Sequence, residues 1–190
     1  HSWGAMLATR YAGLHPDAIQ GLVLCEPGGL KWDDILTYVE NSRSFNIWGE
    51  LLNDATYMDQ FITGREDQHE ILDYKYGILS SENEITGESN VDSASFWRAG
   101  AIINEALFEI GNDIEPDLSE GISGFHVPVK FFYSQYNTAY PDAWAQRITS
   151  VYNTVDITKI PGVGHNGIIT DRYAWTTITM PEIITYFQSL

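Results

Sequence analysis

The sequence predicts a parallel α/β domain that is interrupted by a long helical insertion. At both ends of the chain, short apolar runs that suit buried strands alternate with helical patterns. Between these ends, helical patterns dominate residues 31–120. The order strand, long helical excursion, strand, helix, strand, helix is typical of a parallel α/β fold with an insertion. We therefore expect residues 1–30 and 121–190 to form one α/β core and residues 31–120 to form an inserted helical lid.

The first two elements are a helix and a strand. Residues 3–15 carry small residues on one side and bulkier apolar residues elsewhere, and Pro16 ends this helical pattern. The next run, from Ile19 to Pro27, is apolar, is richest in strand-forming residues at 22–24, and is followed by two glycines. Such a run is typical of a strand that is buried on both faces of a parallel sheet.

The remaining elements follow from the same patterns. A polar stretch at 80–90 predicts a loop within the insertion, and Pro181 suits the first turn of a closing helix. The expected strands are 127–134 and 155–162, and the expected helices are 32–43, 66–80, 93–111, 141–152 and 179–190.

Composition and charge exclude several classes of protein. The chain has 190 residues, of which 44% are hydrophobic and 13% aromatic, so it suits a globular domain. A net charge of −16 argues against partners such as nucleic acid and anionic membranes, because no basic stripe is present to neutralise phosphates. Cys25 is the only cysteine and fits a reducing compartment, so we expect a cytoplasmic protein. No Cys/His cluster has metal-ligand spacing, and we expect neither a metal nor another cofactor.

The opening His1-Ser2-Trp3-Gly4 predicts a nucleophile. One glycine before it would complete G-x-S-x-G, the motif in which a serine occupies a sharp, strained turn between a strand and a helix. Ser2 would then stand at the edge of the sheet and at the positive end of the following helix. The backbone N–H of Trp3 would serve as one donor of an oxyanion hole.

A second motif predicts a general base. Pro161-Gly162-Val163-Gly164-His165 begins at the end of the last expected strand. A histidine on a glycine-rich loop at the C-terminal end of a strand is placed to approach a nucleophilic serine. His165 is the only one of the five histidines that lies on such a loop.

These motifs, in this order, resemble the C-terminal two-thirds of an α/β-hydrolase. The resemblance lies in "HSWGAMLATRYAGLHPDAIQGLVLCEP" and in "PVKFFYSQYNTAYPDAWAQRI" with "VDITKIPGVGHNGII", and it is greatest to proline iminopeptidases and related cap-domain hydrolases. The insertion matches the lid of that family in position. The resemblance implies a serine hydrolase that cleaves an ester or amide bond of a small molecule or short peptide through an acyl-enzyme.

The acid of the triad departs from the family pattern. The family places an aspartate just after its seventh strand, where this sequence has Asn137. Glu26, at the end of the preceding strand, is the favoured replacement, because some α/β-hydrolases resemble this arrangement and a buried charge requires a partner. In that version Asn137 orients the triad by hydrogen bonding to Glu26 or to the imidazole. The alternatives are a site with Asn137 and no acid, or Asp142, which also suits the first turn of a helix.

Three functional interpretations follow. The first is a serine hydrolase that uses Ser2, His165 and Glu26. The acidic side chains of its insertion would either bind the free amino group of a peptide, as in an aminopeptidase, or form only a solvated helical face. The second is a carboxylesterase, and the third is a non-catalytic hydrolase homologue that binds a small ligand or partner. The family also has about five strands before the elbow, so we expect a fragment of a longer protein. As an isolated chain it would be inactive and would leave the strand within residues 21–27 as an unpaired hydrophobic edge.

Overall fold

The computed structural model describes residues 1–42, 85–87 and 101–190, with only the backbone described for 101–106, and it contains two compact units. The first unit comprises His1–Ser42, Ile85–Gly87 and Glu115–Leu190. The second comprises Arg43–Glu84 and Glu88–Ile114, and its described element is helix α6, Ala101–Ile114. Residues 31–42, 85–87 and 115–120, which the sequence analysis places in the insertion, thus group with the sheet. The helix expected at 66–80 and the first part of the one expected at 93–111 lie outside the described residues.

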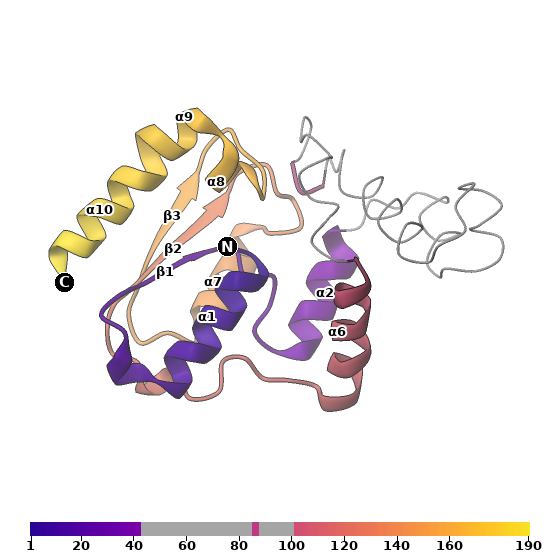
Figure 1. Cartoon of the computed structure of the whole chain (residues 1–190). Helices are drawn as coiled ribbons and strands as arrows, with labels where there is room; N and C mark the ends of the chain where they lie inside the picture. The colour runs from indigo at the N-terminus through magenta and orange to yellow at the C-terminus, as the bar shows by residue number, and fades with distance from the viewer. Residues whose placement is uncertain (43–84, 88–100) are drawn as a thin grey trace. The chain divides into compact units, whose positions relative to one another are not determined.

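A three-stranded parallel sheet forms the centre of the first unit (Figure 1). Strand β1 (Leu22–Cys25) pairs with β2 (Val129–Ser134), which pairs with β3 (Val155–Ile160). The register places Cys25 opposite Phe132 and Phe132 opposite Thr158. This confirms the predicted sheet of three parallel strands, although β1 begins three residues after the start of its apolar run.

Helices cover both faces of the sheet. Alternate strand residues point to opposite faces, so each strand contributes side chains to the packing on both sides. Helices α1 (Trp3–Leu14) and α7 (Asp142–Thr149) contribute to the core on one face, with Leu24 and Phe131 of the strands. On the other face Cys25 and Phe132 pack with the helical segment that follows β3. That segment contains α8 (Gly167–Thr170), α9 (Arg172–Ala174), a π-helical turn η5 (Trp175–Thr179) and α10 (Met180–Ser189) (Figure 1).

A tight turn after β1 brings helix α2 (Trp32–Ser42) against the end of the sheet. Glu26 has a positive φ of 41°, and Pro27-Gly28-Gly29 follow it. A Cβ atom added to Gly28 would lie 2.6 Å from Cδ1 of Tyr38 on α2, so this contact requires glycine. The Tyr140 hydroxyl donates to the carbonyl of Pro27 at 3.0 Å, and Trp144 Nε1 donates to the carbonyl of Gly28 at 3.0 Å. The backbone on either side of Glu26 is therefore fixed by packing.

The remaining described elements are two short 3₁₀ turns, η1 (Pro16–Ala18) and η4 (Ile122–Gly124). Among the described helices, none combines the length and the apolar character that crossing a bilayer requires.

Candidate active site

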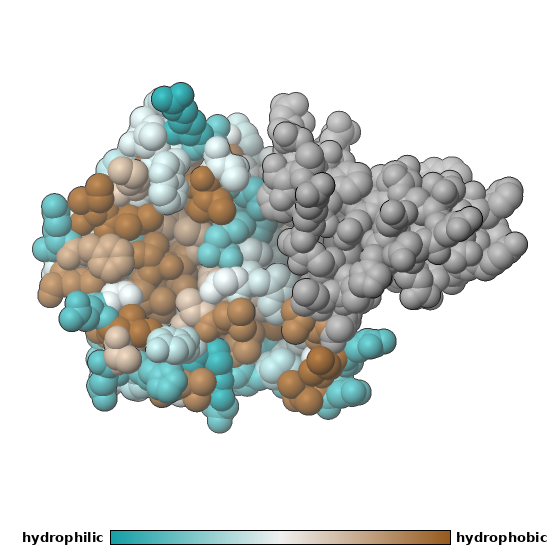
Figure 2. All heavy atoms as spheres, viewed as in Figure 1, coloured by the Kyte–Doolittle hydropathy of each residue, from teal (hydrophilic) through white to brown (hydrophobic). Residues whose placement is uncertain are grey.

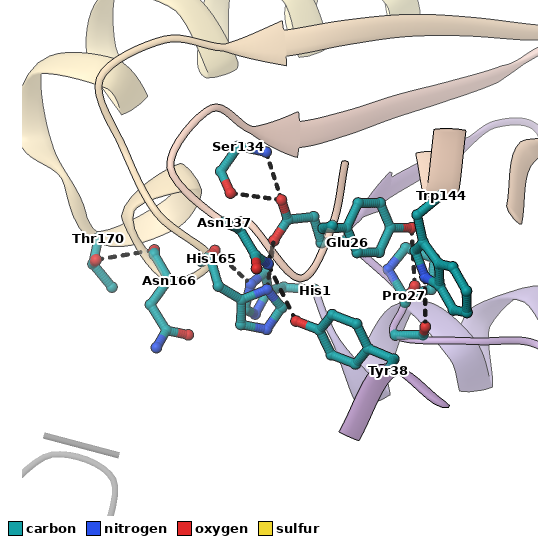
Figure 3. A network of polar contacts seen from close by, with 12 residues as sticks. His1, Glu26, Pro27, Tyr38, Ser134, Asn137, Trp144, His165, Asn166 and Thr170 are labelled. Atoms are coloured by element: carbon teal, nitrogen blue, oxygen red, sulfur yellow. Dashed lines mark hydrogen bonds and ion pairs between the residues drawn. The ribbon is translucent and has the colours of Figure 1, made fainter. Parts of the chain in front are cut away.

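Polar side chains gather where the three parallel strands end (Figure 3). Glu26 directly follows β1, Ser134 is the last residue of β2, and His165 lies in the loop after β3. Ser2 precedes helix α1, which packs against the same sheet. Because parallel strands bring their carboxyl ends to one edge, motifs that are far apart in the sequence meet there.

Ser2 has the strained backbone that the elbow motif predicts. Its φ of 51° and ψ of −124° lie outside the regions that residues with a side chain normally adopt, and strain of this kind concentrates at functional sites. The Ser2 N–H donates to the carbonyl of Cys25 at 2.9 Å, which fixes the serine beside the end of β1. Helix α1 begins at Trp3, so Ser2 stands at the positive end of the helix dipole and Trp3 belongs to the first turn.

Glu26 is fully buried and accepts hydrogen bonds at both carboxylate oxygens. Its Oε1 accepts from the backbone N–H of Ser134 at 2.5 Å and from the Ser134 hydroxyl at 2.6 Å. Its Oε2 accepts from Asn137 Nδ2 at 3.0 Å and lies 2.5 Å from Nδ1 of His165. Burial alone would raise the pKa of Glu26, but the hydrogen bond and charge of His165, together with the Ser134 donors, lower it below its usual value of 4.5. The group is therefore a buried carboxylate with its charge satisfied.

His165 is held by both its ring and its backbone. Because Nδ1 contacts Glu26, Nε2 is the ring atom that remains to exchange a proton with a nucleophile. The backbone N–H donates to the carbonyl of Thr86 at 2.8 Å, and the backbone carbonyl accepts from His1 Nε2 at 2.9 Å. The His1 and His165 rings also contact each other, with centroids 4.4 Å apart.

The connection between Ser2 and His165 therefore runs through His1, the neighbour of Ser2. Among the described residues no hydrogen bond joins the Ser2 hydroxyl directly to the His165 ring. Such bonds in substrate-free enzymes are often long and form only when substrate is bound.

Asn137 and Asp142 occupy different environments. Asn137 is 2% exposed, and its Nδ2 donates to Glu26 and, at 3.2 Å, to the hydroxyl of Tyr38. Among the described residues its Oδ1 has no hydrogen-bond partner. Asp142 is exposed in the first turn of α7 and binds Lys159 Nζ at 2.6 Å and the Tyr133 hydroxyl at 3.1 Å. The structure thus brings Ser2, Trp3, Glu26, Asn137 and His165 to one edge of the sheet and joins Asp142 to Lys159 instead.

Four residues of this network escape sequence reasoning: His1, Tyr38, Thr86 and Ser134. A sequence signal exists for Ser134, because a polar residue that ends a buried strand lies at the edge where a neighbouring strand delivers Glu26. His1 adjoins the motif serine but has no pattern of its own. Tyr38 and Thr86 come from segments whose approach only the tertiary fold determines.

The described residues contain no group of three or more His, Cys, Asp or Glu side chains arranged to hold a metal ion.

Comparisons with known proteins place these features in a family context. A family model described as "alpha/beta hydrolase fold" matches residues 1–171, a range that includes all the site residues named above. A search of curated proteins found no match. Among solved structures, an esterase from a marine microorganism shares 15% identity at a TM-score of 0.46, covering 94% of this chain and 67% of that one. Haloalkane dehalogenase DbeA from Bradyrhizobium elkani USDA94 shares 14% identity at a TM-score of 0.44, covering 100% of this chain and 67% of that one.

Proposed function

The chain belongs to the α/β-hydrolase fold family, and from this premise we propose that it is a serine hydrolase with Ser2 as nucleophile, His165 as general base and Glu26 as the acid. The observation that carries the proposal is the contact of 2.5 Å between His165 Nδ1 and the fully buried carboxylate of Glu26. A carboxylate on Nδ1 directs Nε2 toward the nucleophile and stabilises the imidazolium that forms when the serine gives up its proton.

The acylation half of the reaction follows from these roles. Ser2 Oγ attacks the carbonyl carbon of the substrate while its proton passes to Nε2 of His165. The carbonyl oxygen becomes an oxyanion, and the Trp3 N–H at the start of α1 donates to it, assisted by the helix dipole. The intermediate then collapses, the bond to the leaving group breaks, and His165 returns the proton to that group.

The second half restores the enzyme. A water molecule gives a proton to His165 and attacks the acyl-serine carbonyl carbon, and the ester bond to Ser2 Oγ breaks as Oγ regains the proton. In both halves the charge of Glu26 balances the imidazolium.

Glu26 accounts for the missing aspartate. A non-catalytic protein is the interpretation that Asn137 favours, because an amide cannot stabilise an imidazolium as a carboxylate does. The close approach of Glu26 to His165 supplies that carboxylate, and Asn137 supports it as a hydrogen-bond donor. Asp142 is occupied by Lys159, which makes it a surface ion pair rather than a partner for His165. The arrangement therefore favours an enzyme over a binding module.

A serine nucleophile attacks the carbonyl carbon of an ester or an amide. We therefore propose that the substrate is a small ester or amide. An aminopeptidase would use acidic side chains of the insertion to bind a free amino group, and most of those residues lie outside the described ranges. A carboxylesterase would need no such charge. Parallel assays with p-nitrophenyl acetate and prolyl p-nitroanilide separate the two, because only the aminopeptidase hydrolyses the anilide at a comparable rate.

A fluorophosphonate probe tests the proposal directly, because it phosphonylates an activated serine. We expect the full-length protein to be labelled, Ser2→Ala to abolish labelling, and Ser150→Ala, a control at an exposed serine after α7, to retain it. Peptide mapping should place the adduct on Ser2. Folded protein that is not labelled, or labelling that survives Ser2→Ala, contradicts the proposal.

A further inference from the structure

Three residues of the insertion, Ile85-Thr86-Gly87, lie against the loop that carries His165 and belong to the same compact unit. The carbonyl of Thr86 accepts the backbone N–H of His165 at 2.8 Å. The carbonyl of Ile85 accepts both the N–H and the hydroxyl of Thr138, at 2.7 and 3.0 Å. Consecutive carbonyls of the tripeptide therefore bind the base loop and the loop that carries Asn137.

The contact with the base loop leaves no space for a side chain. Gly87 has a φ of +76°, and a Cβ atom built on it would lie 2.7 Å from Cβ of Tyr136 and 2.8 Å from Cα of Gly164. In the opposite direction, a Cβ on Gly164 would lie 2.4 Å from the carbonyl oxygen of Thr86. Two glycines thus allow two backbones to touch directly beside His165.

The two loops that the tripeptide joins carry the parts of the acid–base pair. The N–H of Tyr136 donates to the carbonyl of Val163 at 2.9 Å, so the loops are also bonded to each other. One presents Asn137 to Glu26, and the other presents Nδ1 of His165 to the same carboxylate. A shift of either loop would change the geometry of this pair.

We propose that Ile85-Thr86-Gly87 is a positioning element for the base: it holds the His165 loop against the Tyr136–Thr138 loop and so keeps Nδ1 on Glu26. The catalytic meaning of this inference rests on the proposed function, whereas its geometric content does not. In sequence, the tripeptide lies between two stretches of the insertion, so the insertion contributes directly to the placement of the general base.

Two glycines with the same backbone strain provide the test. Gly87 and Gly162 have φ values of +76° and +75°, and Gly162 lies three residues before His165. A Cβ on Gly162 would meet nothing within 4 Å, whereas one on Gly87 collides with both loops. Gly87→Ala and Gly162→Ala therefore share the cost of a positive φ, and only Gly87→Ala displaces the loop. We expect Gly87→Ala to lower kcat roughly 100-fold, with KM changed less than about threefold, and Gly162→Ala to keep kcat within about threefold of the parent.

Gly164→Ala tests the same contact from the other side. If Gly87→Ala and Gly164→Ala both act by separating the two backbones, the double variant should lose little more activity than either single variant. Additive losses mean that the two glycines act independently, which contradicts a shared positioning contact.

A readout that does not require turnover separates this inference from the proposed function. The proton between His165 Nδ1 and Glu26 should give a downfield proton resonance that is lost in Glu26→Gln. We expect Gly87→Ala to shift or broaden that resonance while Gly162→Ala retains it, whether or not the protein reacts with a fluorophosphonate. An unchanged resonance in folded Gly87→Ala overturns the positioning role, and absence of labelling in the parent protein overturns only the proposed function. If Gly87→Ala does not fold, the variant Thr138→Val provides the test, because it removes the hydrogen bond from the Thr138 hydroxyl to the carbonyl of Ile85. We expect it to shift the resonance and to lower kcat about 2- to 10-fold. No change in either quantity contradicts the inference.

Discussion

At the scale of single residues, Asn137 and Glu26 depend on each other. The amide of Asn137 lies 3.0 Å from Oε2 of Glu26 and donates to it. A carboxylate at position 137 would instead face the charge of Glu26 across that distance, and two buried carboxylates so close cannot both be ionised. Once the acid is supplied by the end of β1, an amide at position 137 is the compatible neighbour.

Asn137→Asp should therefore impair the protein rather than restore a family-like triad. As the pH falls below neutral, the two carboxylates would bind one shared proton. This proton would remove negative charge from Glu26, the partner of His165. We expect kcat/KM to fall by about 10- to 100-fold, with the acid limb of its pH profile moved to higher pH. Gln146→Glu on the exposed face of α7 adds the same charge as a control. Activity equal to or above that of the parent protein contradicts this account.

The lowered pKa of Glu26 also predicts how stability depends on pH. A carboxyl group whose pKa is lower in the folded state stabilises the fold above its unfolded value, and this contribution is lost as the pH falls through the folded pKa. The Glu26→Gln variant places an amide against the Ser134 and Asn137 donors and should cost about 1–3 kcal/mol of unfolding free energy at pH 7. The difference between parent and variant should shrink below pH 4.5 in urea titrations. A difference that is constant with pH would show that Glu26 is not charged in the fold.

Sequence reasoning located the motif residues but not the contacts that hold them. Ser2, Glu26 and His165 each lie beside a local signal, namely an elbow, the end of an apolar run and a glycine-rich loop. Ser134 acts on this site through its backbone N–H as well as its hydroxyl, and Thr86 acts through its backbone carbonyl; every residue has such backbone groups. No residue type in the sequence marks which backbone groups will meet, so these partners require the folded structure.

At the scale of elements, Lys130 ties β2 to β3 and α10. Its side chain is 5% exposed, and Nζ binds Asp156 Oδ2 at 2.6 Å, Thr158 Oγ1 at 2.9 Å and Glu182 Oε2 at 2.5 Å. Burial would lower the pKa of Lys130, but its hydrogen bonds to Asp156 and Glu182 raise it above the usual value of 10.5. The ammonium group is therefore charged, and its ligands belong to the two neighbouring elements.

Lys130→Met should destabilise the fold by about 1–3 kcal/mol, because charged hydrogen bonds between three elements are lost while the two exposed carboxylates regain water. Urea unfolding at pH 7 measures this change. Lys159→Met is the matched control, because Lys159 is an exposed strand lysine that pairs with an exposed aspartate, and such pairs contribute little. Equal destabilisation by the two variants contradicts the anchoring role of Lys130.

The elements themselves are predicted well where the pattern is long and less well where it is short. The three strands and helices α1, α2 and α7 lie where the apolar patterns place them. The segment 167–179, which forms two short helices and a π-helical turn, has no clear periodicity of its own. Its Ile168 and Ala174 are buried against Phe132, so tertiary packing rather than local preference determines this path.

At the scale of the whole chain, an apolar face and a large negative charge have opposite effects on self-association. Figure 2 shows apolar residues in brown over the region where β1 runs between α10 and α1 in Figure 1. Exposed apolar side chains of these two helices include Leu7, Leu14, Ile184 and Phe187. Among the described strands β1 pairs only with β2, so its other edge borders this face. A face of this kind favours association, while the net charge of −16 opposes it.

Self-association of the 190-residue polypeptide should therefore increase with salt. Screening shortens the reach of charge repulsion to roughly 10 Å at 0.1 M salt without weakening apolar contacts. We expect light scattering to detect larger species at 0.5 M than at 0.02 M sodium chloride, and Phe187→Asp on the exposed apolar side of α10 to reduce them. Tyr173→Asp, at an exposed residue of α9, is the control. A monomer at both salt concentrations contradicts this prediction.

The central claim, that the acid on His165 is Glu26, is tested most directly by the rate at which Ser2 reacts with a fluorophosphonate in two variants. Loss of the carboxylate on the catalytic imidazole lowers turnover by about 10⁴-fold in serine proteases, so Glu26→Gln should slow labelling by about 10³- to 10⁴-fold. Asn137→Ala leaves the carboxylate in place and removes its hydrogen bond from Asn137, together with the bond from Asn137 to Tyr38, so it should slow labelling about tenfold. Equal, small losses in the two variants, or a larger loss in Asn137→Ala, would contradict the assignment of Glu26.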